Sequence, residues 1–141
     1  MALKRICNRC GRTYEAGTTC ACKRKRADYP RTDWYNTPAW RATRDAVRIR
    51  DYDTDRLELL QDRLEWPDKL RALKDMTVAV KDNRKIVHHI EPREENPARI
   101  YDLDNLITVK ASTHELIHLL YKSELKQATQ EFLRQAVEYE Y

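Results

Sequence analysis

Residues 85–118 read KIVHHIEPREENPARIYDLDNLITVKASTHELIH and contain all four histidines of the 141-residue chain. His88 and His89 end a segment rich in β-branched residues, whereas His114 and His118 stand four residues apart in a segment with a helical pattern. Neighbouring side chains on a strand point to opposite faces, and residues four apart on a helix share a face. One strand histidine can therefore join the two helix histidines around a divalent metal ion, while the other faces a substrate.

Three parts of this stretch, IVHHIEP (86–92), DLDNLITV (102–109) and THELIH (113–118), resemble the ββα-metal core of HNH nucleases. The doubled histidine, the asparagine and the final His-x-x-x-His are similar to the nuclease domains of colicin-type toxins. The whole chain resembles small HNH proteins of phages and prophages, in which a cysteine knuckle and a Trp-Arg-rich helix precede the core. The resemblance implies an α+β fold: a ββα-metal (HNH) core with flanking helices and an N-terminal zinc-knuckle-like segment.

Carried over residue by residue, the resemblance assigns one divalent metal ion to His88, His114 and His118. His89 would be the general base that takes a proton from water, which suits a side chain whose unperturbed pKa lies near neutrality. Asn105 would hold the loop that orients His89. A histidine at the edge of an apolar helix face is the ordinary alternative for His118, and a turn residue is the alternative for Asn105.

The implied function is a metal-dependent endonuclease that hydrolyses DNA phosphodiester bonds to 5′-phosphate and 3′-hydroxyl products and is encoded by a phage or prophage. Imidazole-rich sites favour zinc or nickel, and carboxylate-rich sites favour magnesium or manganese. His88 stands where family members commonly have an acidic residue, which favours the softer ions without distinguishing Zn, Ni, Mg and Mn. Many phage relatives carry Cys-x-x-Cys pairs within the core, but this chain has Lys110 and Thr113 near those places. Packing must therefore hold its core together.

A second cluster contains all four cysteines, Cys7, Cys10, Cys20 and Cys22. Cys-x-x-Cys followed by Gly11 is the first half of a zinc knuckle, because glycine lets the backbone turn toward the sulfurs. The Cys-x-Cys second half is less usual. We expect a structural zinc ion at this four-cysteine site, with free thiols as the alternative.

Charge is distributed unevenly along the chain. Residues 1–50 hold 13 Lys and Arg against 4 Asp and Glu, whereas residues 51–141 hold 14 against 19. A basic segment suits a polyanionic partner such as double-stranded DNA, because cations placed on phosphates release condensed counterions. A merely soluble tail is the alternative. The expected phosphate contacts are Lys23, Arg24, Lys25, Arg26, Arg31, Arg41, Arg44, Arg48 and Arg50.

No stretch approaches the roughly eighteen apolar residues of a membrane span, and the N-terminus lacks the apolar centre of a signal peptide. We therefore expect a cytoplasmic protein, in the host bacterial cytoplasm if a phage encodes it. The phage resemblance also makes packaging proteins, terminase or portal, candidate partners. The alternatives to an enzyme are a non-catalytic, zinc-stabilised DNA-binding or packaging-accessory protein and a zinc-stabilised interaction protein.

The length suits one domain with a small appendage. The predicted segments, in chain order, are a zinc-knuckle-like segment (1–23), a basic linker or arm (24–37), a basic helical segment (38–75), the catalytic core (76–121) and a C-terminal helix (122–141).

Thr37 as N-cap and Pro38 at the first helical position predict a helix over 38–51. A second helix is predicted from Thr54 to Pro67, and a short one over 68–73. Trp34, Tyr35 and Trp40 can pack against the core or stack on DNA, and packing is favoured.

From Met76 the period changes, and TVAV and KIVHHI predict two strands joined by a turn at Asp82-Asn83. The stretch 91–105 is predicted to be an ordered loop. Ser112 is expected to cap the helix that carries His114, and a last helix is predicted over 123–138.

Overall fold

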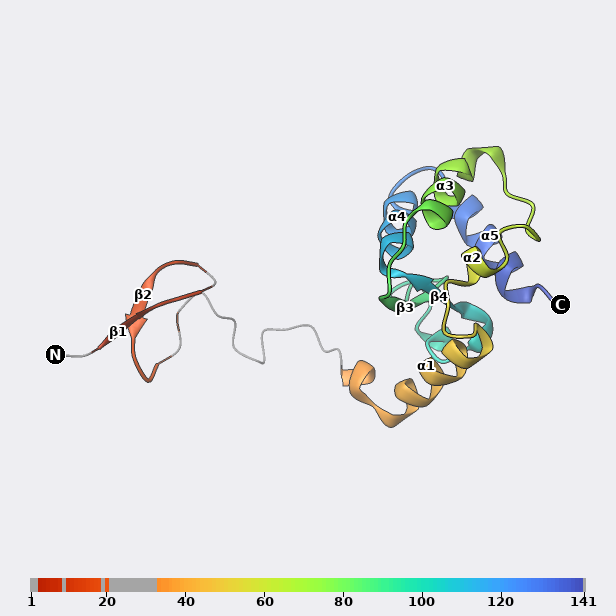
Figure 1. The fold of residues 1–141 in the computed structure, drawn as a ribbon. Coiled ribbons are helices and arrows are strands. Elements are labelled where there is room, and N and C mark those ends of the chain that lie inside the picture. The colour runs from red at the N-terminus through yellow and green to blue at the C-terminus, as the bar shows by residue number, and fades with distance from the viewer. Residues whose placement is uncertain (1–2, 9, 19, 21–32, 141) are drawn as a thin grey trace. The chain divides into compact units, whose positions relative to one another are not determined.

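The computed structural model describes residues 3–8, 10–18, 20 and 33–140 (Figure 1). They belong to two compact units, Met1–Trp34 and Tyr35–Tyr141, and each unit is described by itself. Several predicted site residues lie outside the described residues: Cys22, Lys23, Arg24, Lys25, Arg26 and Arg31. The described residues have a mixed α+β fold, as the sequence predicts. None of the described helices has both the length and the apolar character that a membrane crossing needs.

The N-terminal unit contains a short antiparallel pair, β1 (Lys4–Ile6) and β2 (Thr13–Glu15). The connection between them turns back on itself, because the Cys7 N–H donates to Arg12 O and the Gly11 N–H donates to Cys7 O, both at 2.8 Å. Gly11 has a φ of +76°, in the left-handed region that glycine adopts without steric cost. The predicted glycine turn after the second cysteine is therefore present.

A 3-10 turn (Asp33–Asn36) spans the boundary between the two units in the sequence and is followed by α1 (Pro38–Arg50) of the larger unit, so the predicted helix over 38–51 is confirmed. The Thr37 hydroxyl accepts a hydrogen bond from the Trp40 N–H at 3.2 Å, which is the expected N-cap. The helix buries Trp40 and Val47.

The second predicted helix is much shorter than expected. Helix α2 covers only Arg56–Leu59, and its N-cap is Asp55, whose carboxylate accepts from the Glu58 N–H at 3.1 Å. Thr54 is not the cap, because its hydroxyl donates to Asp51 O at 2.7 Å. Beyond it the chain continues in turns, and the Trp66 indole N–H donates to Gln61 O at 3.0 Å. A side chain thus pairs with a carbonyl that a continuous helix would bond internally.

The strand predicted from Met76 is wrong. A 3-10 turn (Asp68–Leu70) leads into α3 (Arg71–Ala79), so the TVA of TVAV ends a helix. Leu73 and Thr77, one helical turn apart, are both fully buried, so packing overrides the β-branched composition. The buried Lys110 ammonium donates to the carbonyls of Thr77 and Val80 and closes the end of this helix.

The two strands of the larger unit are β3 (Lys85–His89) and β4 (Leu106–Lys110), paired antiparallel with His88 opposite Ile107. The KIVHHI strand is therefore confirmed, but its partner lies downstream and not across an Asp82-Asn83 hairpin. The connection over 91–105 is a loop, as predicted, with 3-10 turns at Pro97–Arg99 and Leu103–Asn105.

Helix α4 (Ala111–Tyr121) follows β4 without an intervening loop. Ser112 is not its cap: it lies inside the first turn, and its N–H donates to the Asp82 carboxylate at 3.3 Å. The acceptor for this N–H at the start of the helix is therefore a carboxylate from a distant segment and not the side chain of Ser112. The last helix, α5 (Lys126–Glu138), is close to its predicted range.

A continuous apolar core joins these elements. Leu57 of α2 and Phe132 of α5 belong to it, so apolar packing joins the elements of this unit. Figure 1 shows the β3–β4 pair between α1 and α4, and both helices contact both strands. Successive side chains of β3 therefore meet different helices. The buried core residues are Leu57, Leu70, Leu73, Ile90, Ile107, Val109, Ile117, Phe132, Leu133, Ala136 and Val137.

Candidate metal centre

Three of the four histidines meet where β3 faces α4. One ring nitrogen from each of His88, His114 and His118 lies within 4.8 Å of the others. The ring centroid of His88 is 5.2 Å from that of His114 and 5.6 Å from that of His118. The three predicted ligands are thus brought together.

The geometry of the cluster suits a small divalent cation. The Nε2 atoms of His114 and His118 are 2.9 Å apart. Nitrogens bound to one tetrahedral zinc ion at about 2.0–2.1 Å are roughly 3.3 Å apart, so only a small adjustment separates this pair from ligand spacing. An all-imidazole set favours zinc or nickel. Three protein ligands leave a tetrahedral position for water or substrate.

Burial keeps the rings of His88 and His114 neutral. It lowers the pKa of His88 well below its usual range, and the neighbouring His114 and His118 lower it further. Burial, with a smaller effect of His118, lowers the pKa of His114 to about 4. A neutral imidazole is the form that binds a metal ion, so these ligands need lose no proton near neutral pH.

Tyr121, which the sequence analysis did not identify, touches the cluster. Its hydroxyl donates to Ile90 O at 2.7 Å and lies 3.2 Å from Nε2 of His88. Because the hydroxyl has a single proton, it acts as acceptor toward His88, which places that ring's proton on Nε2 and its lone pair on Nδ1. Burial raises the pKa of Tyr121, so the hydroxyl stays protonated. The sequence signal that could have identified Tyr121 is its position seven residues after His114, which places it on the same helix face.

His89 lies in different surroundings, as the strand alternation predicts. Its ring stacks on Trp40 of α1, with centroids 5.2 Å apart and planes at 19°. Its Nε2 lies 3.1 Å from Ile100 O. A carbonyl can only accept, so Nε2 carries the proton and Nδ1 the lone pair. Burial lowers the pKa of His89, and the hydrogen bond to Ile100 partly opposes this, which leaves a neutral ring able to accept a proton.

Asn105 ties the two ends of the 91–105 loop together. Its side-chain oxygen accepts from the Glu91 N–H at 2.8 Å, and its amide donates to Glu91 O at 3.2 Å and Arg99 O at 3.3 Å. Its own carbonyl accepts from the Ile90 N–H at 2.8 Å. The side chain is 1% exposed, so it is a buried junction and more than a turn residue. It holds the backbone on both sides of the loop that carries Ile100.

The cysteine cluster is a second candidate metal site. Ligand atoms of Cys7, Cys10 and Cys20 lie within 4.8 Å of one another, and Sγ of Cys10 is 3.6 Å from Sγ of Cys20. Sulfurs bound to one tetrahedral zinc ion at about 2.3 Å are roughly 3.8 Å apart, so the observed spacing fits. Cys22, the fourth predicted ligand, lies outside the described residues.

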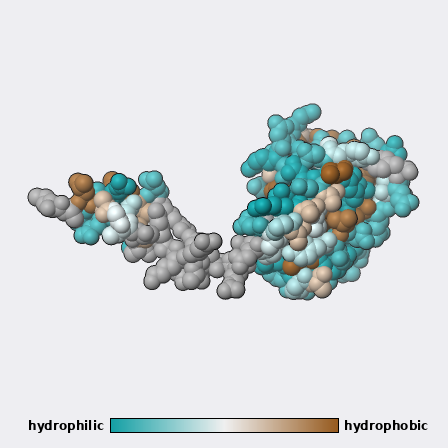
Figure 2. All heavy atoms as spheres, turned by 90° about the horizontal axis from the view of Figure 1, so that it is seen from below, coloured by the Kyte–Doolittle hydropathy of each residue, from teal (hydrophilic) through white to brown (hydrophobic). Residues whose placement is uncertain are grey.

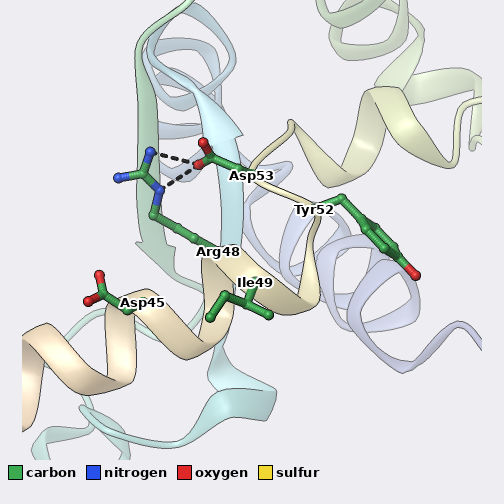
Figure 3. Close-up of a pocket in the computed structure, with 5 residues that line it drawn as sticks. All are labelled: Asp45, Arg48, Ile49, Tyr52 and Asp53. Atoms are coloured by element: carbon green, nitrogen blue, oxygen red, sulfur yellow. Dashed lines mark hydrogen bonds and ion pairs between the residues drawn. The ribbon is translucent and has the colours of Figure 1, made fainter.

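The arginines of α1 differ in their availability to a polyanion. Arg41 is exposed, whereas Arg44 is paired with Asp45 at 3.4 Å and Arg48 with Asp53 at 2.7 Å. Figure 3 shows Arg48 and Asp53 at a surface pocket that Asp45, Ile49 and Tyr52 also line. Two carboxylates against one guanidinium make this pocket a poor place for a phosphate.

Arg50 is not a surface cation. Its guanidinium donates to Leu103 O at 2.8 Å and Leu106 O at 2.7 Å, and it pairs with the buried Asp51. It therefore fastens α1 to the start of β4, and the expectation of a phosphate contact is wrong for this residue. Figure 2 shows one face of this unit, on which hydrophilic residues surround a smaller group of hydrophobic ones.

Neither the family models, nor the curated proteins, nor the solved structures that we compared contain a match to this chain. The function therefore has to be argued from the two clusters. His88, His114 and His118 can hold a cation, and His89 is a neutral ring held beside His88 on the same strand.

Proposed function

We propose that this chain is a metal-dependent DNA endonuclease of the HNH type. Its ββα-metal core would consist of β3, the 91–105 loop, β4 and α4. The observation that carries the proposal is the convergence of His88, His114 and His118 next to a fourth histidine whose tautomer a backbone carbonyl sets. A lone metal-binding cluster would be less specific, because structural metal sites need no adjacent base.

His88, His114 and His118 would hold the metal ion in this core. When bound, the ion would supply Lewis-acid stabilisation of the charge that develops on a phosphodiester and its leaving 3′-oxygen. Three neutral imidazoles bring no negative charge of their own, so the full charge of the cation remains available to an anionic substrate.

His89 would act as the general base. With the proton on Nε2 donated to Ile100 O, the lone pair of Nδ1 would take a proton from water, and the ring would become an imidazolium. The carbonyl dipole of Ile100 then stabilises that charge. Attack of the resulting hydroxide on phosphorus would break the P–O3′ bond, and the 3′-oxygen would take a proton from solvent, which leaves a 5′-phosphate and a 3′-hydroxyl.

Asn105 would be a positioning residue in this scheme. Its hydrogen bonds hold Glu91, at the start of the loop, and Arg99, which directly precedes Ile100. A loop held at both ends keeps the acceptor for His89 in place before substrate arrives.

The substrate class follows from charge and from the candidate core. Exposed Arg41 and the basic residues Lys23, Arg24, Lys25, Arg26 and Arg31 would contact the DNA backbone. A structural zinc ion on the cysteine cluster would fold the N-terminal unit beside this basic stretch. We further propose a phage or prophage origin, a host cytoplasmic setting and packaging proteins as partners.

The direct test is cleavage of supercoiled plasmid by the full chain, separately with Ni²⁺, Zn²⁺, Mg²⁺ and Mn²⁺. We expect wild type to convert the plasmid to nicked or linear form and His89→Ala to lose at least about a hundredfold in rate. Glu115→Gln, an exposed position on α4 between the two ligands, is the matched control and should cleave normally.

A non-catalytic, zinc-stabilised DNA-binding or packaging-accessory protein is the second candidate. The fit of the cysteine cluster to zinc favours it, because that site is independent of the histidines. Wild type that binds plasmid but cleaves it no faster than His89→Ala would select this candidate and reject the enzyme.

A further inference from the structure

The position of Trp40 is fixed by the start of helix α1. Thr37 and Pro38 fix the start of α1, and Trp40 lies in its first turn with 2% of its surface exposed. The sequence left two uses open for this indole, packing in the core or stacking on DNA. Its burial excludes stacking on DNA, and its indole stacks on the imidazole ring of His89.

The stack on Trp40 adds a second restraint to the hydrogen bond that His89 makes with Ile100. A single hydrogen bond along a ring edge lets an imidazole tilt about the N–H···O axis. An indole that lies at 19° to the ring, with centroids 5.2 Å apart, blocks this tilt from one face. The face contact and the edge contact together define the direction of Nδ1, the nitrogen with the lone pair.

We propose that Trp40 is a positioning residue for His89: by stacking on the imidazole it directs Nδ1 toward the water that is to be deprotonated. This inference rests on the proposed function for its consequence in catalysis, but the stack itself is independent of it.

The test compares Trp40→Leu and Trp40→Phe with Val47→Ala, all in the full chain. Val47 is also buried on α1, at 0% exposure, so its variant reproduces a packing defect of the same helix. The first readout is the NMR position of the His89 ring protons, assigned with His89→Ala and recorded without DNA.

We expect the indole ring current to shift these His89 signals upfield in wild type and in Val47→Ala. Trp40→Leu should abolish the shift, and Trp40→Phe should keep part of it, because phenyl is a smaller ring. His89 signals that do not move in a folded Trp40 variant would overturn the proposal. If Trp40→Leu does not fold, the comparison of Trp40→Phe with wild type decides alone.

The second readout is steady-state cleavage. Trp40→Leu should lower kcat about ten- to a hundredfold with KM changed less than about twofold, and Trp40→Phe should recover part of kcat. An equal loss in Val47→Ala would mean that helix packing, and not the stack, is responsible, and would overturn the positioning role. If neither wild type nor any of the variants cleaves DNA, the endonuclease proposal fails. The NMR result still decides whether Trp40 orients His89.

Discussion

The Nε2 atoms of His114 and His118 face each other at 2.9 Å, one turn apart on α4. His88 lies beside this pair and completes a group of three imidazoles. Such a group is arranged for a shared cation more readily than for its own hydrogen bonding.

His118→Ala removes one of the three nitrogens and should weaken Ni²⁺ binding by more than about a hundredfold. The measurement is calorimetric titration of protein whose cysteine site already carries zinc, so that only the histidine cluster is filled. Glu115→Gln serves as control. Equal affinity in His118→Ala would return His118 to an ordinary helix-surface residue.

Tyr121→Phe deletes the hydroxyl that accepts from Nε2 of His88 and keeps the aromatic volume. Without it the proton of His88 is no longer directed to Nε2, so we expect the same titration to show Ni²⁺ binding weakened by about tenfold. Thermal unfolding should change little, because the ring remains. An unchanged affinity would show that the hydroxyl serves only Ile90.

Asn105→Ala leaves the Glu91 N–H and the carbonyls of Glu91 and Arg99 without their side-chain partner. We expect a loss of about 2–3 kcal/mol in the free energy of unfolding, measured with urea. Asn96→Ala removes a single hydrogen bond to the Glu91 carboxylate, and this bond is more accessible to solvent. It should therefore lower the free energy of unfolding clearly less than Asn105→Ala does. Similar losses in the two variants would contradict the junction role of Asn105.

Glu91 links stability to pH. The Asn96 amide, followed by the charges of Arg99 and Arg134, lowers the pKa of its carboxyl below the ordinary value of 4.5. A depressed folded-state pKa means that the ionised carboxylate stabilises the protein above that value, and that this contribution is lost as pH falls through the folded-state pKa. Glu91→Gln should therefore be less stable than wild type at pH 7, and the gap should close toward pH 3. A gap of constant size across urea titrations at these pH values would exclude this linkage.

Arg41 and Arg48 should differ as DNA contacts. Arg41→Ala should weaken DNA binding and reduce the slope of log affinity against log salt by about one. Arg48→Ala should change both much less, because Asp53 already neutralises this guanidinium at 2.7 Å. Fluorescence anisotropy with a labelled duplex at several salt concentrations measures both effects, and equal slopes for the two variants would contradict this ranking.

Local signals in the sequence predicted much of this site. The Thr37-Pro38 pair locates the start of α1, and the i, i+4 spacing places His114 and His118 on one face of α4. Alternation along a strand separates His88 from His89. Each of these signals depends only on a few neighbouring residues, so the structure agrees with it even though distant contacts were not considered.

Several wrong predictions and both missed residues depend on distant partners. Thr77 and its neighbours look like a strand, but buried Lys110, far along the chain, closes them into the end of a helix. The start of α4 is completed by Asp82 across the fold and not by Ser112. The roles of Tyr121 and Trp40 depend on which backbone carbonyl and which ring they reach, and no local pattern encodes that.

His88 and His89 are neighbours on β3, so they lie on opposite faces of the strand. Which of them takes each proposed role therefore depends on whether the number of residues before it in the strand is odd or even. Inserting or deleting one residue between Lys85 and His88 would rotate each imidazole to the opposite side of the ribbon and exchange ligand with base. Length variation should therefore be tolerated in the exposed part of the 91–105 loop and forbidden within the strand. In this strand, the count of residues is as strictly constrained as their identity.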